Sequence, residues 1–201
     1  LAEGMGVHEI LDDALIAAMD EVGEMFSEGT IFVPEMLLAA RAMKAGLQVL
    51  RPLLTKSKAK PKGKVLLATV QGDVHDIGKN LVGMMLEGAG YIVIDLGVNA
   101  TKEAILAKAE ELAPDVVGLS ALLTTSMPAM AKTVAAFKQA GHAAPVIVGG
   151  APVTQDFADA IGAHGYGADA PGAVLKVGEL VAARRAAEAP GEAAEAATCA
   201  A

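Results

Sequence analysis

Strand and helix patterns alternate between Lys64 and about Arg185, and this alternation limits the possible folds more than any other feature of the sequence. Four strand segments are nearly continuous aliphatic runs, at 64–70, 91–96, 115–120 and 145–149, and we expect a short fifth near 165–168. Such runs are typical of strands buried on both faces, as in a parallel sheet covered by helices. The sequence therefore predicts an α/β fold with a flavodoxin-like or Rossmann-like five-stranded parallel sheet.

Helix start and stop signals lie between these strands. Thr101 and Thr154 stand directly before helical patterns, as N-cap residues do, and Ser126 stands before another with Pro128 just inside it. Glycines follow three of the helical patterns, at 90, 141 and 162. Glycine is the residue most often found just past a helix end. Each strand is thus expected to connect to the next through a helix.

Residues 1–54 predict a helical cap of two helices. Apolar residues recur there at spacings of three and four: Leu11, Leu15, Ala18, Val22 and Met25, then Met36, Ala40, Met43, Leu47, Leu50 and Leu54. A break at 27–29 separates the two stripes, and Pro34 opens the second helix, where proline is tolerated. A helical hairpin cannot bury both of its faces alone. Either further helices precede Leu1, or the hairpin packs on another part of the protein.

The segments on either side of the α/β region (64–185) predict a linker and a tail. Residues 55–63 are rich in lysine and contain Pro61 and Gly63, which favours an extended solvated linker over a polyanion-binding patch. Residues 186–201 show no regular apolar pattern. We expect a flexible tail there, with weak helix as the alternative.

Composition excludes several classes of function. The formal net charge of −8 argues against a nucleic-acid binder, which needs a basic surface. Cys199 is the only cysteine, so the chain has neither a disulfide framework nor a cysteine zinc cluster. No apolar run reaches the length of a membrane span, and no signal peptide pattern opens the chain. A cytoplasmic protein that does not bind a membrane is the expectation.

Residues suited to ligand chemistry follow three of the predicted strands. The first strand is followed by Gly72, Asp73, Val74, His75, Asp76, Ile77 and Gly78, the third by Ser120, Leu122 and Thr124, and the fourth by Gly149 and Gly150. In a flavodoxin-like sheet these three strands are neighbours, and the strand order reverses between the first and the third. The crevice at such a reversal is where open parallel sheets bind ligands.

Each residue type in this group has a definite chemical use. His75 offers an imidazole nitrogen to a transition metal, while Asp73 or Asp76 can hold its other N–H and fix the tautomer. The hydroxyls of Ser120 and Thr124 can hydrogen-bond a polar group that enters the crevice. The glycines leave room for a bulky ligand to approach the backbone. The sequence therefore predicts a ligand site around His75.

These motifs resemble those of cobalamin-binding domains, which carry D-x-H-x-x-G, S-x-L and a double glycine. Here they read GDVHDIG, SAL and GG. The segment MDEVGEMFSEGTIFVPEMLLAARAMKAGL resembles the helical cap that precedes such a domain in corrinoid-dependent methyl transfer. Residues 8–185 as a whole resemble the corrinoid protein of a methyltransferase system and are similar to the cobalamin-binding region of methionine synthase. The family's cap is a four-helix bundle, of which only the last two helices and a remnant are evident here.

The resemblance implies a cofactor and roles for individual residues. The cofactor would be cobalamin or a related corrinoid, bound with its own base displaced and with His75 as the lower axial ligand of cobalt. Asp73 would support His75. The displaced tail would lie in a slot formed by Ser120, Leu122, Thr124, Gly149 and Gly150 and completed by Tyr166, Ala168 and Asp169. Phe26 and Val33 match cap positions over the upper face, and Asp12 matches a contact to the cofactor.

The resemblance also implies a function. The protein would accept a methyl group on cobalt from a substrate-specific methyltransferase and pass it to a second methyltransferase, and a reductive activation protein is a further partner that the family suggests. Two other cobalamin-binding classes stay open: the small subunit of an adenosylcobalamin-dependent mutase, and a cobalamin-dependent regulatory module. A phosphoacceptor domain shares the fold but needs an aspartate where Ser120 and Ala121 stand.

Overall fold

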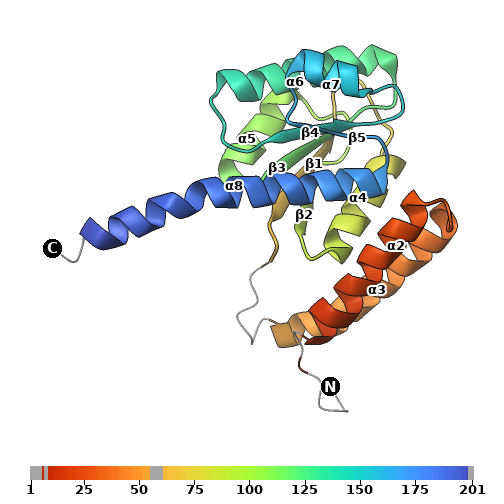
Figure 1. The fold of residues 1–201 in the computed structure, drawn as a ribbon. Helices are drawn as coiled ribbons and strands as arrows, with labels where there is room; N and C mark the ends of the chain where they lie inside the picture. The colour runs from red at the N-terminus through yellow and green to blue at the C-terminus, as the bar shows by residue number, and fades with distance from the viewer. Residues whose placement is uncertain (1–5, 7–8, 55–60, 199–201) are drawn as a thin grey trace.

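A five-stranded parallel sheet forms the centre of the molecule (Figure 1). The computed structural model describes residue 6 and residues 9–54 and 61–198, and leaves out the side chains of 51–54, of 188–198 and of some positions before 50. The strands are β1 (Lys64–Thr69), β2 (Ile92–Asp95), β3 (Val116–Ser120), β4 (Val146–Gly149) and β5 (Gly165–Gly167). Their order is β2-β1-β3-β4-β5, and every neighbouring pair is parallel. The predicted α/β sheet, including its reversal between the first and third strands, is confirmed.

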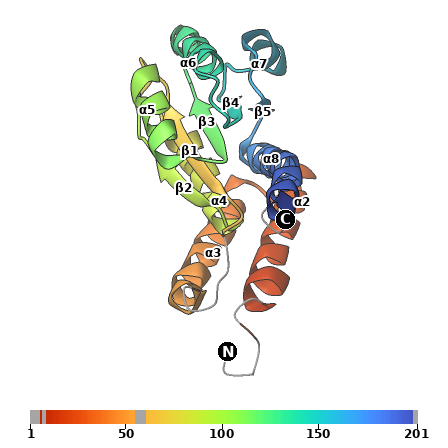
Figure 2. The same cartoon turned by 90° about the vertical axis from the view of Figure 1, so that its left-hand side faces the viewer.

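Helices cover both faces of the sheet (Figure 2). One face packs against α5 (Lys102–Leu112), α6 (Met127–Gln139) and α7 (Gln155–Ile161), and the other against α4 (Ile77–Gly88) and α8 (Ala170–Thr198). A 3-10 turn, η2 (Thr124–Ser126), precedes α6. Strands β1, β3 and β4 are buried along almost their whole length, whereas the edge strand β2 is partly exposed. The sheet therefore has two aliphatic cores, one on each face.

The expected helix caps form at two of the three predicted positions. Thr101 Oγ1 accepts a hydrogen bond from the backbone N–H of Ala104, and Thr154 Oγ1 accepts one from Phe157. Each bond satisfies a donor that the first helical turn leaves free. Ser126 also precedes its helix, but its side chain makes no cap hydrogen bond.

The cap is a helical hairpin that packs beside α4 and α8 (Figure 1). It consists of a π-helical segment, η1 (Ile10–Ile16), followed by α2 (Ala17–Ser27) and α3 (Val33–Leu54). In α3 the predicted stripe is buried at Met36, Ala40, Met43 and Leu50. The helices α3 and α4 approach closely where Met43 faces Gly88. A Cβ at Gly88 would lie only 3.2 Å from Met43 Cγ. The hairpin thus buries one face against the α/β domain.

Of the two possibilities given for the segment after residue 185, the structure shows the helix. The helix α8 continues to Thr198, past the end of the sheet (Figure 1). The segment consists mainly of alanine and glutamate, which have high helix propensity even without a periodic apolar stripe. Most of the predicted linker, 55–60, lies outside the described residues. Within the described part of the chain, no helix is long and apolar enough to cross a membrane.

Candidate functional site

The carboxyl ends of the strands meet in register at one edge of the sheet. Thr69 pairs with Ser120, Ser120 with Gly149, and Gly149 with Gly167, so one row of residues crosses β1, β3, β4 and β5. The turns that follow β1, β3 and β4 leave from this row. The predicted juxtaposition of the three motifs is therefore present in the structure.

Asp73 anchors the turn after β1 through hydrogen bonds. Its side chain is fully buried, and both carboxylate oxygens accept hydrogen bonds. Oδ1 lies 3.0 Å from the backbone nitrogen of His75 and 2.8 Å from its ring Nδ1. Oδ2 accepts from the backbone N–H groups of Leu122 and Leu123 at 2.7 and 3.0 Å and from Ser126 Oγ at 2.8 Å. One buried carboxylate thus ties the turn after β1 to the turn after β3.

These hydrogen bonds control the charge of Asp73. Burial by itself would raise the pKa of the Asp73 carboxyl, because it penalises the charged form. Donors from His75, Ser126 and Leu122 outweigh burial and hold the pKa well below its usual range. The group is therefore an ionised carboxylate, which can only accept hydrogen bonds.

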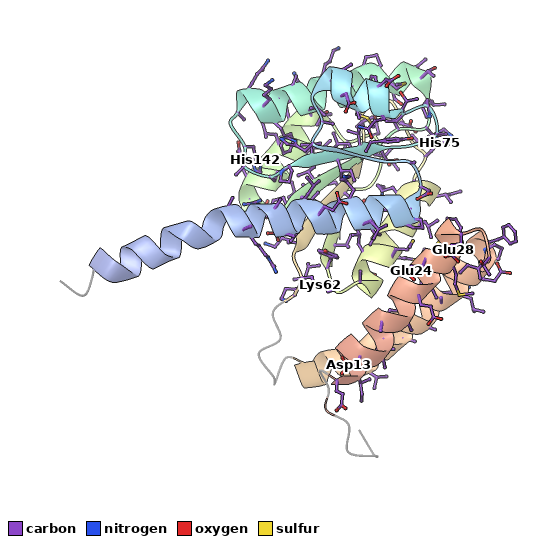
Figure 3. All side chains as sticks on the ribbon, in the orientation of Figure 1. Asp13, Glu24, Glu28, Lys62, His75 and His142 are labelled. Atoms are coloured by element: carbon purple, nitrogen blue, oxygen red, sulfur yellow. The ribbon has the colours of Figure 1, made fainter. Side chains whose placement is uncertain are left out.

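The position and tautomer of His75 follow from Asp73. Because a carboxylate cannot donate, Nδ1 must carry a proton, and in the neutral imidazole this leaves a lone pair on Nε2. The backbone carbonyl of His75 accepts a 3.0 Å hydrogen bond from the buried Thr69 hydroxyl. The side chain is 46% exposed and lies at the edge of the α/β domain (Figure 3). The arrangement presents one imidazole nitrogen outward, which suits coordination to a metal.

Exposed apolar side chains lie in the two turns that Asp73 joins. Val74 and Ile77 lie within two residues of His75 in the sequence, and Leu122 and Leu123 come from the turn whose N–H groups bind Asp73. Ile77 is 86% exposed although it begins α4. A group of exposed apolar residues around a polar centre is typical of a ligand-binding surface.

A cavity of about 220 Å³ opens between the sheet and helices α4 and α8. Its lining includes Ser120 and several glycines of the strands, among them Gly118, Gly149 and Gly167. These glycines leave no space for a side chain, because a Cβ at Gly118 would lie 2.6 Å from Leu67 Cδ2 and one at Gly167 would lie 2.7 Å from Ala173 Cβ. Leu67 and Ala173 thus pack directly against these two glycines in the cavity wall.

Gly150 is the position of the site where the absence of a side chain is most strictly required. Its φ is +129°, and a Cβ would lie 1.8 Å from the carbonyl oxygen of Ala121. The turn after β4 therefore crosses the end of β3 at a distance that only glycine permits. The double glycine is needed for the close approach of two backbone segments at the mouth of the cavity.

Comparison with known proteins assigns the chain to a family. A family model described as a B12 binding domain matches residues 63–175, and a second model with the same description matches residues 1–51. The chain belongs to the B12-binding corrinoid protein family. It is 45% identical to trimethylamine corrinoid protein 2 of Methanosarcina mazei over 181 residues, which cover 88% of this chain and 83% of that protein.

Two solved structures of B12-binding proteins share the fold. A cobalamin-binding protein from Desulfitobacterium hafniense is 34% identical, with a TM-score of 0.75, and the match covers 87% of this chain and 82% of that one. The methanol:cobalamin methyltransferase complex of Methanosarcina barkeri contains a chain that is 34% identical, with a TM-score of 0.76, where the match covers 87% of this chain and 67% of that one.

The structure brings most of the predicted B12-site residues together. Asp73, rather than Asp76, holds the His75 ring, and Asp76 stands at the start of α4 without a side-chain cap. Ser120, Gly149, Gly150, Ala168 and Asp169 line the cavity, as does Gly78. Gly72 lies in the turn with a φ of +85° and contributes its N–H to Asn99.

Three predicted slot residues lie elsewhere. The Tyr166 side chain packs on the opposite face of the sheet, with the core beneath α5, α6 and α7. Leu122 is exposed beside His75 and reaches Asp73 only through its backbone, and Thr124 is exposed at the start of η2. In the cap, Phe26 is partly buried in α2, whereas the side chains of Asp12 and Val33 lie outside the described residues. Glu28, at the end of the hairpin, lies on the same side of the molecule as His75 (Figure 3).

Sequence reasoning missed two buried polar residues of the site. Ser126 is buried and donates to Asp73, although its place before a proline predicted a helix cap. Lys79 lines the cavity, is only 4% exposed, pairs with Asp95 and donates to Asn80 Oδ1 at 3.1 Å. Gly118 and Gly167 also line the cavity, and the signal for Gly118 was a glycine inside an aliphatic strand.

Proposed function

We propose that the chain is a corrinoid-binding methyl carrier, which receives a methyl group from one methyltransferase and hands it to a second. The bound corrinoid supplies the chemistry, because its cobalt takes up and releases the methyl group. The observation that supports the proposal is the pairing of His75 with a buried, ionised Asp73 at an exposed apolar edge. A carboxylate–imidazole pair of this kind is the usual support of a metal-ligating histidine.

His75 would bind the cobalt of the corrinoid in place of the cofactor's own base. Its Nε2 points away from Asp73 and is available without a change of tautomer. The hydrogen bond from Nδ1 to Asp73 orients the ring and increases the basicity of Nε2. Ser126 and the N–H groups of Leu122 and Leu123 prevent the carboxylate from turning away.

The surfaces beside His75 suit a macrocycle with a tail. The exposed side chains of Val74, Ile77, Leu122 and Leu123 are suited to contact an apolar ring face. The cavity along β3, β4 and β5, with Ser120 in its lining, would hold the displaced nucleotide tail. The hairpin would cover the reactive face of the bound corrinoid, and by the family resemblance Phe26 and Val33 would shield that face while Asp12 would contact the cofactor.

Two observations favour methyl transfer over the mutase and regulatory alternatives. The helical segment before the α/β domain matches a B12 binding domain model of its own at residues 1–51. The named relatives are a trimethylamine corrinoid protein and part of a methanol methyltransferase complex. Because these relatives share one fold and differ in methyl donor, the methyltransferase partner selects the donor. A reductive activation protein completes the set of proposed partners.

Cobalt coordination tests this proposal. The protein is labelled with ¹⁵N-histidine, loaded with hydroxocobalamin and reduced to Co(II), and its electron paramagnetic resonance spectrum is recorded. We expect nitrogen splitting that changes from three lines to two on labelling, since ¹⁵N has spin one half. His75→Ala should remove the change in a protein that is still folded, because the side chain is half exposed. A splitting that labelling does not alter would show that the cofactor's own base binds cobalt.

A further inference from the structure

The turn that carries His75 is held from two sides, and only one side involves Asp73's carboxylate. On the other side, the loop after β2 binds the backbone of the same turn. Asn99 Oδ1 accepts a 2.8 Å hydrogen bond from the Gly72 N–H, and the Asn99 N–H donates to the Asp73 carbonyl oxygen at 2.9 Å. We propose that Asn99 is a positioning residue for His75, which fixes the backbone from which the imidazole projects.

The conformation of Asn99 explains why asparagine suits this position. Its φ is +53°, in the left-handed region that non-glycine residues other than asparagine and aspartate rarely adopt. Within the described chain, Ala113 is the one other non-glycine residue with positive φ, and it ends α5. Asn99 therefore combines an unusual backbone conformation with a side-chain acceptor that faces the turn.

The loop that holds Asn99 is itself firmly attached. Ala100 donates to the Thr69 carbonyl at 2.9 Å, and Thr69 donates to the Gly97 carbonyl at 3.0 Å, which continues the β1–β2 pairing. Asp95 accepts from the Gly97 N–H at 2.8 Å and pairs with the buried Lys79 of α4. The loop is thereby anchored to β1 and to α4. It can serve as a rigid support for the turn beside it.

Loss of the Asn99 acceptor should loosen the turn without unfolding the protein. Gly72 is exposed, so its freed N–H would bond to water. Gly72 also has a φ of +85°, and glycine offers the backbone other conformations once its hydrogen bond is gone. Asp73 would keep its bonds to Leu122, Leu123 and Ser126, so the change would be confined to the backbone next to His75. A metal ligand depends on such support for its exact placement.

The first test uses the apo protein and three variants. Asn99→Gly keeps the left-handed backbone and removes the acceptor, Asn99→Asp keeps an acceptor oxygen, and Ala113→Gly is a control at the other left-handed residue. Amide hydrogen exchange of Gly72 is measured by NMR. We expect about twofold to tenfold faster exchange in Asn99→Gly, which corresponds to about 0.4–1.4 kcal/mol at 1.4 kcal/mol per tenfold. Asn99→Asp and Ala113→Gly should match wild type.

The second test rests on the proposed function and measures cobalt coordination. Each protein is loaded with hydroxocobalamin and reduced, and the ratio of histidine-bound to histidine-free Co(II) is read from the resonance spectrum. We expect a twofold to tenfold lower ratio in Asn99→Gly and restoration in Asn99→Asp. Unchanged Gly72 exchange, or faster exchange with unchanged coordination, would overturn the role of Asn99. If wild type itself shows no histidine nitrogen on cobalt, the proposed function fails, and the exchange data still decide whether Asn99 holds the turn.

Discussion

Replacing Asp73 by asparagine tests the arrangement on which the site depends. The amide has nearly the same shape as the carboxylate but only one acceptor oxygen, and its nitrogen carries two donors. Five donor atoms face the two oxygens in the wild-type protein. The better orientation places the amide oxygen toward Leu122, Leu123 and Ser126. The amide NH₂ then faces the backbone N–H and the ring of His75, so donors oppose donors.

The loss of folding stability in Asp73→Asn can be worked out from these contacts. The backbone N–H of His75 loses its acceptor, which costs about 1–3 kcal/mol for a buried donor. Three charge-assisted bonds become neutral ones, at about 1 kcal/mol each. Burial of an amide costs less than burial of a carboxylate, which offsets part of this loss. We expect Asp73→Asn to lower the free energy of unfolding by about 3 kcal/mol.

The variant should also change the tautomer of His75. A ring nitrogen that faces an NH₂ group must accept, so the proton moves from Nδ1 to Nε2 and blocks the nitrogen that we propose binds cobalt. Urea unfolding of the apo protein gives the stability, and ¹⁵N chemical shifts of the His75 ring give the tautomer. Asp76→Asn is the matched control, since Asp76 makes no cap hydrogen bond, and it should change stability by less than about 0.5 kcal/mol.

Two results would refute this reasoning. One is a loss of stability below about 1 kcal/mol in Asp73→Asn, comparable to that of the control. It would mean that the carboxylate is not the buried acceptor of these donors. The other is a His75 ring that keeps its proton on Nδ1 in the variant. That result would show that Asp73 does not determine the tautomer of His75.

Three further predictions test other parts of the structure. Gly118→Ala places a methyl group 2.6 Å from Leu67 and in the cavity wall, so hydroxocobalamin uptake, followed by absorbance, should weaken about tenfold with a stability loss of about 1–3 kcal/mol. Gly83→Ala is the control: its methyl group would lie 3.3 Å from Leu67 at a position outside the cavity lining, so hydroxocobalamin uptake should be retained. Burial raises the pKa of the Tyr91 phenol above its value in the unfolded chain, which is about 10. The stabilisation from the neutral phenol is therefore complete below pH 10 and is lost as the pH rises further. Between pH 9 and 11 the free energy of unfolding should fall less in Tyr91→Phe than in wild type. Ser126→Ala should cost about 1–3 kcal/mol in urea unfolding and clearly less when Asp73 is already asparagine.

The order of the sheet and the place of the site could be predicted from sequence because both depend on local patterns. Strands such as β1 are aliphatic along most of their length, and the motif residues follow them directly. Tyr166 shows what was overlooked. In β5 it stands between Gly165 and Gly167, and side chains alternate between the faces of a strand. Because Gly167 pairs with Gly149 in the cavity wall, the tyrosine must point to the other face.

Lys79 illustrates a different limit of sequence reasoning. A lysine in the first turn of a helix is normally solvated, and its spacing gives no sign of burial. Here α4 contacts the edge strand β2, and Asp95 at the end of that strand provides the partner of Lys79. The pair joins residues 16 positions apart that only the sheet order places together. Burial of such a charge requires a partner, and that partner is known only once the topology is known.

Ser126 shows how energies decide between two acceptors that compete for one hydroxyl proton. As an N-cap, the serine oxygen would accept a hydrogen bond from the first turn of α6, but no such bond forms, and the hydroxyl has a single proton to donate. The structure offers that proton two acceptors, Asp73 Oδ2 at 2.8 Å and the Leu123 carbonyl at 2.7 Å. A bond to a buried carboxylate contributes about 1.5–3 kcal/mol, against about 0.5–1.5 kcal/mol for a neutral acceptor. The charged acceptor therefore wins, and it lies 53 residues away in the sequence. A local pattern that predicts a helix start thus becomes part of the site through a partner that only the folded sheet supplies.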